Sequence, residues 1–467
     1  MRAGAFRAVA GFLGWMLAAG CALARAQALP PEIDAALART RLPRDAVTLL
    51  VAPVEAGGPA RLAYRIDAPV NPASIAKLVT TYASLELLGP AYTWATPVYV
   101  DGPVQGGVLQ GNLYLKGQGD PKLVVEKLWL LMRRVQGLGI QRIAGDIVLD
   151  RSAFETAPAD PGAFDGEPMR PYNAAPDALL VNFKSVVMTF TPQNGHARVQ
   201  VEPPLAGVQW PATVPTTPGE CGDWRGGLRA DWRDPAAPRF AGGYPAACGE
   251  RVWPIAYADP PGYAARAVLG MWQSLGGALG GQVREGRVPA GLAPVFEWRS
   301  PPLAEVLRDI NKFSNNVMAQ QVFLTLSREA RGVGTLEGSR EVLRSWWQGR
   351  IGGEPPAIEN GAGLARGDRI TARQLGQLLQ LAWRSPFMPE LASSLPISGQ
   401  DGTLRRMQGM AVAHLKTGSL RDVAGVAGFV HGASGRRYVL VAIANHPNAG
   451  AIRSLFEPLM AWAARDN

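Results

Sequence analysis

The chain has 467 residues, a net charge of +9 and 47% hydrophobic residues. This length suits about three domains, and the apolar content is enough to bury a large core, which excludes a globally disordered chain. The 54 glycines and 39 prolines predict many turns but stay below a low-complexity composition. No run of five basic residues, zinc-finger spacing or aromatic RNA-binding box is present, so we expect no nucleic-acid partner.

The first 26 residues are typical of a secretory signal peptide. Arg2 and Arg7 precede an apolar run over residues 8–23, and Ala24-Arg25-Ala26 is a small-residue cleavage site. We expect cleavage after Ala26 and export to the periplasm, which lowers the net charge to +6 because three arginines are removed. An uncleaved membrane anchor and lipidation at Cys21 are the two alternatives. No later segment reaches 18 uninterrupted apolar residues, so the mature protein is expected to associate with a membrane loosely at most.

Two cysteines, Cys221 and Cys248, remain after the leader. An even pair in an oxidising compartment predicts a disulfide that closes a loop of about 28 residues, and two free thiols are the alternative. No histidine lies near either cysteine, so we expect neither a metal site nor a cofactor.

Hydrophobic periodicity predicts elements along the whole chain. The N-terminal part is expected to form a helix at 31–39, strands at 47–54 and 60–66, and a helix at 71–88. The next part is expected to form strands and one helix, at 96–100, 107–115, 123–138 (helix), 143–150 and 185–191. Helical periodicity then returns at 263–279, 303–326, 336–348 and 371–383.

The C-terminal part predicts strands at 411–416, 423–431 and 437–445 and a final helix at 449–464. Strands thus occur before the 71–88 helix and again after residue 410. If both sets join one sheet, part of the middle of the chain is an insertion. Residues 191–265 are rich in Pro, Gly and Trp and hold both cysteines, which indicates a small, loop-rich inserted module.

Three short motifs carry the chemistry: Ser74-Ile75-Ala76-Lys77, Ser314-Asn315-Asn316 and Lys416-Thr417-Gly418. Positions i and i+3 share one face of a helix, so Lys77 can reach the Ser74 hydroxyl. Pro72 suits a helix start, which would place Ser74 near free helical N–H groups. A lysine can act as a base only if its pKa is lowered, and partial burial beside Lys416 would lower it.

Each motif alone has an ordinary interpretation: a serine near a helix start, a turn, and an exposed strand lysine. All three in this order are expected by chance in about one sequence in a thousand. The chain contains only seven lysines, and two of them stand in these motifs.

On these motifs the chain resembles the D-alanyl-D-alanine carboxypeptidase/endopeptidase group of low-molecular-mass penicillin-binding proteins, the penicillin-binding protein 4 type. The resemblance covers nearly all of the mature chain, and the 240 residues between Ser74 and Ser314 separate it from single-domain β-lactamases. Four further stretches match the group: Leu115-Lys116-Gly117-Gln118-Gly119-Asp120-Pro121, Gly145-Asp146-Ile147-Val148-Leu149-Asp150, Asn360-Gly361-Ala362-Gly363-Leu364 and Asp401-Gly402-Thr403-Leu404.

The resemblance implies a mixed α/β (α+β) multidomain fold. A penicillin-binding/β-lactamase-like transpeptidase domain, an antiparallel sheet flanked by helices, would be interrupted by two nested inserted domains. The implied division is a signal peptide at 1–26, a catalytic domain at 27–92 and 298–467, a second domain at 93–190 and 266–297, and a third at 191–265.

The resemblance also implies a serine carboxypeptidase that acts on peptidoglycan stem peptides through an acyl-enzyme and is inhibited covalently by β-lactams. Ser74 would attack the carbonyl of the penultimate D-Ala, with Lys77 as general base. Ser314, linked to Lys77 and Lys416, would relay a proton to the departing amine.

The remaining implied residues bind the substrate. Asn316 would hold Lys77 and the substrate amide, and Lys416 with Thr417 would bind the terminal carboxylate. The N–H groups of Ser74 and Ser419 would form the oxyanion hole, and Gly418 would let the substrate approach its strand. Asp165 lies where related enzymes grip the free amine of the diamino acid. A solvated loop acid is the alternative for Asp165.

Other functions of the same fold stay open. A β-lactamase needs a strong deacylation base, and the chain has no E-x-x-L-N box and no Tyr in place of Ser314. A non-catalytic peptidoglycan-binding relative would not need the complete set of three motifs. An esterase of the same fold would carry the same motifs.

Overall fold

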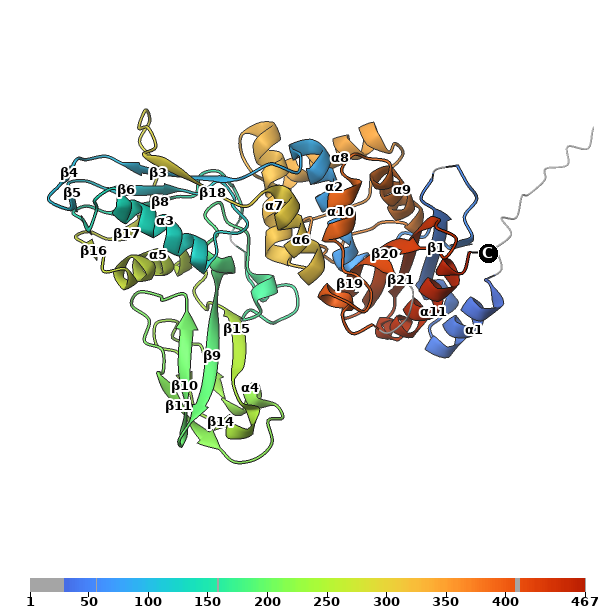
Figure 1. Cartoon of the computed structure of the whole chain (residues 1–467), viewed down its shortest axis with the longest axis horizontal. Coiled ribbons are helices and arrows are strands. Elements are labelled where there is room, and N and C mark those ends of the chain that lie inside the picture. Colours follow the sequence, from blue (N-terminus) through green and yellow to red (C-terminus); the bar gives the residue numbers. More distant parts are fainter. Residues whose placement is uncertain (1–28, 56, 158, 408–411, 467) are drawn as a thin grey trace, which may run out of the picture.

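The computed structural model describes residues 29–55, 57–157, 159–407 and 412–466. The predicted leader and Cys21 lie outside the described residues. Figure 1 shows two parts along the long axis: the two ends of the chain form one part, and the middle of the chain forms the other. The predicted mixed α/β architecture with several sheets is confirmed. In the described ranges, no helix is both long and apolar enough to span a bilayer.

The part built from the two chain ends is organised around an antiparallel sheet with strand order β19–β20–β21–β1–β2. Its strands are β1 (Val47–Pro53), β2 (Leu62–Tyr64), β19 (Ala413–Leu420), β20 (Val423–His431) and β21 (Arg437–Asn445). β1 pairs with β21 from Val47 opposite Ala444 to Pro53 opposite Tyr438. This pairing joins segments almost 400 residues apart, so the chain leaves the sheet after β2 and returns to it at β19.

Helices cover both faces of this sheet. One face carries α1 (Pro31–Thr40) and α11 (Arg453–Ala464). The other carries α2 (Lys77–Leu88), α6 (Leu303–Phe313), α7 (Asn316–Arg331), α8 (Leu336–Arg350), α9 (Ala372–Trp383) and α10 (Met388–Ser394). Val439 and Val441 of β21 pack under the second group, whereas Leu440 and Ala442 pack under the first. Because both faces are buried, the strands read as almost continuous apolar runs rather than alternating ones.

The middle of the chain first forms a five-stranded sheet of order β17–β8–β6–β3–β18. Its strands are β3 (Ala95–Val100), β6 (Leu113–Lys116), β8 (Ile147–Asp150), β17 (Val283–Glu285) and β18 (Phe296–Arg299). A smaller sheet contains β4 (Val104–Gln105), β5 (Val108–Leu109), β7 (Arg142–Ile143) and β16 (Ala278–Leu279). Helices α3 (Val125–Gly137) and α5 (Tyr263–Ser274) pack on each other beside these sheets. Both sheets combine strands from before and after residues 191–265, so the chain makes a further excursion between them.

That excursion forms a third sheet of order β14–β11–β10–β9–β15, which hangs below the second part in Figure 1. It contains β9 (Ser185–Gln193), β10 (His196–Glu202), β11 (Thr213–Thr217), β14 (Tyr244–Pro245) and β15 (Arg251–Ala256), with α4 (Trp224–Gly227), β12 (Ala230–Asp231) and β13 (Arg239–Phe240) beside it. β9 crosses residue 190, where the composition changes, and pairs with both β10 and β15. A boundary at residue 185 keeps this strand in one piece, and we propose that boundary for the third domain.

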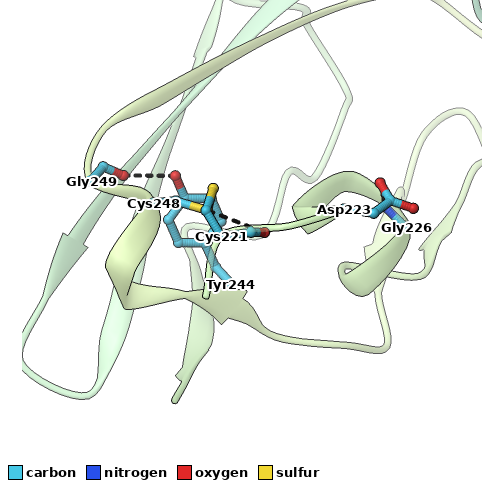
Figure 2. The surroundings of a disulfide bond; sticks show 6 residues. All are labelled: Cys221, Asp223, Gly226, Tyr244, Cys248 and Gly249. Atoms are coloured by element: carbon cyan, nitrogen blue, oxygen red, sulfur yellow. Dashed lines mark hydrogen bonds between the residues drawn. A yellow bond between two sulfur atoms is a disulfide. The ribbon is translucent and has the colours of Figure 1, made fainter. Parts of the chain in front are cut away.

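The predicted disulfide between Cys221 and Cys248 is confirmed. Figure 2 shows it beside Tyr244, whose hydroxyl donates a hydrogen bond to the Gly249 carbonyl at 2.7 Å. Nearby, the Asp223 side chain accepts a hydrogen bond from Gly226 N at 3.1 Å and caps α4. The disulfide therefore connects the long loop after β11, which holds Cys221, to the segment before β15, which holds Cys248.

Several predicted elements differ from the structure. The single strands predicted over 107–115 and 143–150 are each two strands, because the chain passes from the smaller sheet (β5, β7) to the five-stranded sheet (β6, β8) within each segment. The segment predicted as one helix over 263–279 ends at Ser274, because Gly276 adopts a φ of +80° and residues 278–279 join β7 as a strand. The segment predicted as one helix over 303–326 is two helices, α6 and α7, that meet at Ser314. Helical periodicity alone does not reveal such a break, because both halves present apolar faces to the same core.

Replacing both Cys221 and Cys248 with serine should lower the free energy of unfolding by about 3 kcal/mol, because the bond closes a loop of 27 residues. Denaturant unfolding followed by tryptophan fluorescence measures this loss, since Trp224 and Trp253 pack close to each other in the third sheet. The reactivity of Ser74 should not change, because this sheet contributes none of the three motifs. An unchanged unfolding midpoint would contradict the expectation.

Candidate active site

Ser74 lies in a tight turn just before α2 rather than inside an α-helix. Residues Ala73–Ala76 form a 3-10 turn, and α2 begins at Lys77. Three residues per turn place positions i and i+3 directly above each other, which brings Lys77 Nζ to 2.9 Å from Ser74 Oγ. Ser74 is the one residue between 71 and 80 that is not buried. The expected contact between Ser74 and Lys77 is therefore present. The α-helix, however, starts at Lys77 and not at Pro72 as expected.

The Lys77 amine is completely buried and has three oxygen neighbours. Besides Ser74 Oγ, Nζ lies 2.6 Å from Asn316 Oδ1 and 2.5 Å from the Ala362 carbonyl oxygen. A neutral amine has two N–H donors and one lone pair. It can donate to Asn316 and Ala362 while its lone pair accepts the proton of Ser74. This arrangement suits a general base for the Ser74 hydroxyl.

The surroundings of Lys77 favour that neutral form. Burial, followed by the positive charge of Lys416, lowers the pKa of Lys77 well below its ordinary value, while the charge of Asp368 acts in the opposite direction. Burial also lowers the pKa of Lys416 to about 7. Two fully buried amines in one site therefore compete for charge, and each makes it harder to protonate the other.

The Ser314-Asn315-Asn316 motif forms the junction between α6 and α7. Ser314 ends α6 in the left-handed conformation (φ +57°, ψ +37°), which is rare for a residue with a Cβ. Asn315 starts α7, because its side chain accepts a hydrogen bond from Met318 N at 3.0 Å. The turn thus points Ser314 toward Lys416 and Asn316 toward Lys77.

Ser314 and Lys77 are not directly linked. Lys416 Nζ lies 2.9 Å from Ser314 Oγ and 2.8 Å from the Thr417 carbonyl oxygen. Among the described residues, no hydrogen bond joins Ser314 to Lys77, contrary to the expectation of one chain through both lysines. The motif residues form two separate groups instead: Lys77 with Ser74 and Asn316, and Lys416 with Ser314.

The Lys416-Thr417-Gly418 motif lies on β19, at the edge of the first sheet. Lys416 is completely buried, whereas Ser419 is exposed and accepts a hydrogen bond from Arg453 at 2.9 Å. Thr417 Oγ1 pairs with Thr403 Oγ1 at 2.8 Å. A Cβ on Gly418 would collide with the Pro72 carbonyl oxygen. The missing side chain therefore lets β19 pack against the turn that carries Ser74, a role not expected from the sequence.

These residues surround a cavity of about 520 Å³. Three motif residues line it, Ser74, Ser314 and Asn316, together with Ser419, which follows the third motif. The second part of the molecule contributes Asp165, Phe164 and Tyr172, and other segments contribute Phe313, Leu364, Arg366, Leu420 and Arg421. Asp165 thus reaches the same cavity as Ser74 although it comes from an inserted domain. Sequence analysis did not identify Tyr172 or Arg366 as lining residues. Arg366 lies two residues after the stretch 360–364 that matches the family, so that match is the signal that could have indicated it.

Asp165 is held by its neighbours in the loop. Its Oδ2 accepts a hydrogen bond from the Tyr172 hydroxyl at 2.9 Å, and its Oδ1 accepts from Asn173 Nδ2 at 2.8 Å. Partial burial raises its pKa, but the hydrogen bonds from Tyr172 and Asn173 outweigh burial, so the pKa of Asp165 is lowered overall. Asp165 therefore offers a negative charge to the cavity at neutral pH.

The loop that carries Asp165 and Tyr172 is attached to α7. Asn316 Nδ2 donates to the Tyr172 carbonyl at 3.3 Å. The buried Gln321 exchanges two hydrogen bonds of 2.8 Å with the backbone of Asp177. Asn316 thus contacts Lys77 with its oxygen and the inserted part of the chain with its nitrogen, which links the position of that wall to Lys77 and Ser74.

A loop over residues 359–369 closes the other side of the site. It provides the Ala362 carbonyl to Lys77, and its Gly361 carbonyl accepts a hydrogen bond from Thr80 on α2 at 2.7 Å. Asn71 Nδ2 donates to the Ala365 carbonyl at 2.9 Å.

The Asn360 side chain stabilises the loop from within: it accepts a hydrogen bond from Ala362 N and donates one to the Leu364 carbonyl. Gly363 has a φ of +75° and lies against the backbone of Ala73 and Ser74.

Gly363→Ala should displace this loop from Ser74, because the new Cβ would collide with the Ala73 carbonyl oxygen and an L side chain is strained at this φ. We expect a loss of about 2–3 kcal/mol in unfolding free energy and at least a tenfold slower acylation of Ser74. Gly352→Ala is the matched control, since Gly352 has a φ of +82° with open space around it. Equal acylation rates in the two variants would contradict the prediction.

Comparisons with known proteins agree with this geometry. A sequence model of the D-Ala-D-Ala carboxypeptidase 3 (S13) family matches residues 29–466. A D-alanyl-D-alanine carboxypeptidase of Actinomadura sp. (strain R39) is 28% identical over 414 residues, covering 81% of this chain and 74% of the relative. The D-alanyl-D-alanine carboxypeptidase DacB of Haemophilus influenzae is 25% identical over 406 residues, covering 82% of each chain.

A solved structure has a similar fold. The crystal structure of penicillin binding protein 4 (dacB) from Haemophilus influenzae superposes with a TM-score of 0.75 at 21% identity, covering 94% of this chain and all of the other. The inserted parts are therefore shared with that fold as well as the part that carries the three motifs.

Proposed function

The chain belongs to the D-Ala-D-Ala carboxypeptidase 3 (S13) family of serine carboxypeptidases, and on this basis we propose that Ser74 is the nucleophile with which it hydrolyses D-Ala-D-Ala bonds of peptidoglycan stem peptides. The observation that carries the proposal is the buried Lys77 amine, 2.9 Å from Ser74 Oγ and surrounded by acceptors that leave its lone pair for the Ser74 proton. The product would be a stem peptide shortened by one D-Ala.

The first step is acylation of Ser74. The Ser74 proton moves to Lys77 Nζ, Oγ bonds to the carbonyl carbon of the penultimate D-Ala, and the carbonyl oxygen becomes an oxyanion. The backbone N–H groups of Ser74 and Ser419 are the proposed donors to this oxyanion. The carbon–nitrogen bond then breaks, and the terminal D-Ala leaves as an amine that takes a proton from Lys416 through the Ser314 hydroxyl. In the second step water attacks the ester carbon and gives a proton back to Lys416 through Ser314, while Ser74 Oγ leaves the carbonyl carbon and takes its proton back from Lys77.

Lys416 and Thr417 are the proposed binding site for the terminal carboxylate. With a pKa of about 7, Lys416 is easily charged when an anion arrives, because a nearby negative charge favours the protonated form. Its hydrogen bond to Ser314 at 2.9 Å places the same charge beside the proposed proton relay. Binding of the carboxylate and protonation of the leaving amine would then depend on one lysine.

The same chemistry extends to two related reactions. The Haemophilus influenzae protein has been solved in complex with a β-lactam. A β-lactam amide would acylate Ser74 in the same way and be released slowly, which makes such compounds covalent inhibitors. Endopeptidase activity is the reaction with the amine of a cross-linked diamino acid as leaving group. Penicillin turnover faster than acyl-enzyme accumulation would instead favour the β-lactamase alternative.

Export to the periplasm completes the proposal. Cell-wall substrates lie outside the cytoplasm, and the Cys221–Cys248 disulfide needs an oxidising compartment to persist. The leader predicted at residues 1–26 would direct the chain there.

Ser74→Ala and Lys77→Ala test the nucleophile and the base separately. Mass spectrometry after incubation with penicillin should show one adduct on the wild-type protein and none on Ser74→Ala. Lys77→Ala should be acylated about a thousandfold more slowly, because the hydroxyl loses its base. Isolated peptidoglycan should release D-Ala with the wild-type protein only. Normal labelling of Lys77→Ala would refute its role as base, and an adduct on Ser74→Ala would refute the proposed nucleophile.

Asp165→Asn tests the proposed grip on the free amine of the diamino acid. The variant keeps an oxygen that can accept from Tyr172 but loses the charge. We expect KM to rise about fivefold for a peptide with a free side-chain amine, the effect of one exposed ion pair, and to stay unchanged when that amine is acetylated. Asp160→Asn, in the same loop but outside the cavity, serves as control. Equal effects on both peptides would identify Asp165 as a loop acid only.

A further inference from the structure

Asp368 is a buried carboxylate in the loop that contacts Lys77, and the mechanism above gives it no role. It belongs to the 359–369 loop, the loop that presents the Ala362 carbonyl to Lys77. Its side chain has no exposure to solvent. An aspartate is rarely buried completely unless it is paired, because burial disfavours its charged form.

Only one oxygen of this carboxylate has a partner. Oδ1 accepts a hydrogen bond from Glu359 N at 2.8 Å. Oδ2 is enclosed and has no hydrogen-bond partner among the described residues. A purely structural link between Glu359 and Asp368 would need a single acceptor, which an uncharged side chain supplies at lower cost. The second, unpartnered oxygen therefore calls for another explanation.

The Glu359 N to Asp368 Oδ1 hydrogen bond closes the base of the loop. Just outside it, Ala357 and Arg369 exchange two backbone hydrogen bonds of 2.9 Å, and Ile370 does the same with Val70 at 3.0 Å. Between these closures the loop turns toward α2 and places its Ala362 carbonyl 2.5 Å from Lys77 Nζ. Asp368 thus fixes the segment that provides one of the three oxygen neighbours of the base.

The charge of Asp368 also acts at Lys77. Lys77 and Lys416 are both completely buried, and the Lys416 charge lowers the pKa of Lys77 while the Asp368 charge raises it. The other charged groups that face Asp368 are Glu359 and Arg369 of its own loop. Arg340 of α8 donates to the Glu359 carbonyl at 2.8 Å and adds a positive charge at the outer side of the loop. Burial raises the pKa of Asp368 to about 7, so its charge develops around neutral pH and is complete above it.

We propose that Asp368 is a positioning residue for the general base: it holds the 359–369 loop against Lys77, and its negative charge opposes the effect of Lys416 on the Lys77 amine. This inference rests on the proposed function, because it assigns Lys77 the role of base. Asp368 does not touch the substrate cavity. It acts through Lys77 alone and sets the pH range in which Lys77 is neutral.

The test compares Asp368→Asn with Asp120→Asn across pH. Asp120 is a matched control in the second part of the molecule. It is also buried, its Oδ1 accepts from Lys122 N at 2.7 Å, its Oδ2 has no partner among the described residues, and burial raises its pKa to about 7. Asparagine keeps the shape and one acceptor oxygen at both positions, removes the charge, and replaces the unpartnered Oδ2 by an amide NH2 in the variant and in the control alike.

The measured quantity is the second-order rate constant for acylation of Ser74 by a fluorescent penicillin, as a function of pH. In the wild-type protein this rate rises with pH as Lys77 loses its proton. Without the Asp368 charge Lys77 loses its proton at lower pH, so the rise in Asp368→Asn should move down by about one pH unit. The rise in Asp120→Asn should coincide with that of the wild type.

A second measurement follows the protonation of Lys77 directly, so it does not depend on the rate of the reaction. Lysine labelled with 13C at Cε gives few NMR signals, because the chain has seven lysines, and the Lys77 signal is the one lost in Lys77→Ala. Its titration midpoint should fall in Asp368→Asn and not in Asp120→Asn. If Asp368→Asn lowers the melting temperature strongly, Asp368→Ser supplies a smaller neutral acceptor for Glu359 N.

The outcomes are distinct. A lower midpoint in either neutral variant at position 368 supports the proposal. A folded variant whose rate falls equally at every pH, with an unmoved Lys77 midpoint, would show a purely structural Asp368 and overturn it. Absence of penicillin labelling in the wild-type protein would refute the proposed function itself, which separates the two failures.

Discussion

The buried amine of Lys77 is the constraint on which the rest of the site depends. An amine with no access to water must find its hydrogen-bond partners inside the protein, and each missing partner would cost about 1–3 kcal/mol. Its three oxygen neighbours come from the turn before α2, from the start of α7 and from the 359–369 loop. These segments lie up to 288 residues apart in sequence, between Ser74 and Ala362, so the amine can be satisfied only when the fold is complete.

The same constraint extends to the inserted domains. Asn316 holds Lys77 with its oxygen and the Tyr172 carbonyl with its nitrogen, so the wall that carries Asp165 is tied to the catalytic lysine through one amide. Asp177 strengthens this link, because its backbone pairs with Gln321 and its carboxylate forms a buried ion pair with Lys184 at 2.9 Å. A domain inserted into the sequence far from the motifs thus shapes the cavity instead of only extending the molecule.

Several features of the site were predictable from the sequence because they are local. The spacing of Ser74 and Lys77 gives contact in an α-helix and in a 3-10 turn alike, so the expected pair is present although the turn type differs. The apolar runs of β1, β20 and β21 identified a buried sheet. The break at Ser314 was not predictable, because α6 and α7 each keep an apolar face toward one core and the periodicity runs on through the junction.

The sequence by itself determined the candidate chemistry: two serines, two lysines and an asparagine in three motifs, with a disulfide in a loop-rich insertion. Only the tertiary structure decided how these groups are connected. It paired Lys416 with Ser314 and Lys77 with Asn316, and it left Gly418 without a side chain where β19 packs on the turn that carries Ser74. It also buried Asp368 in the loop that contacts Lys77. The reason is physical: residue types fix which protons can move, whereas burial and distance fix which amine is neutral, and both depend on segments that meet only in the folded chain.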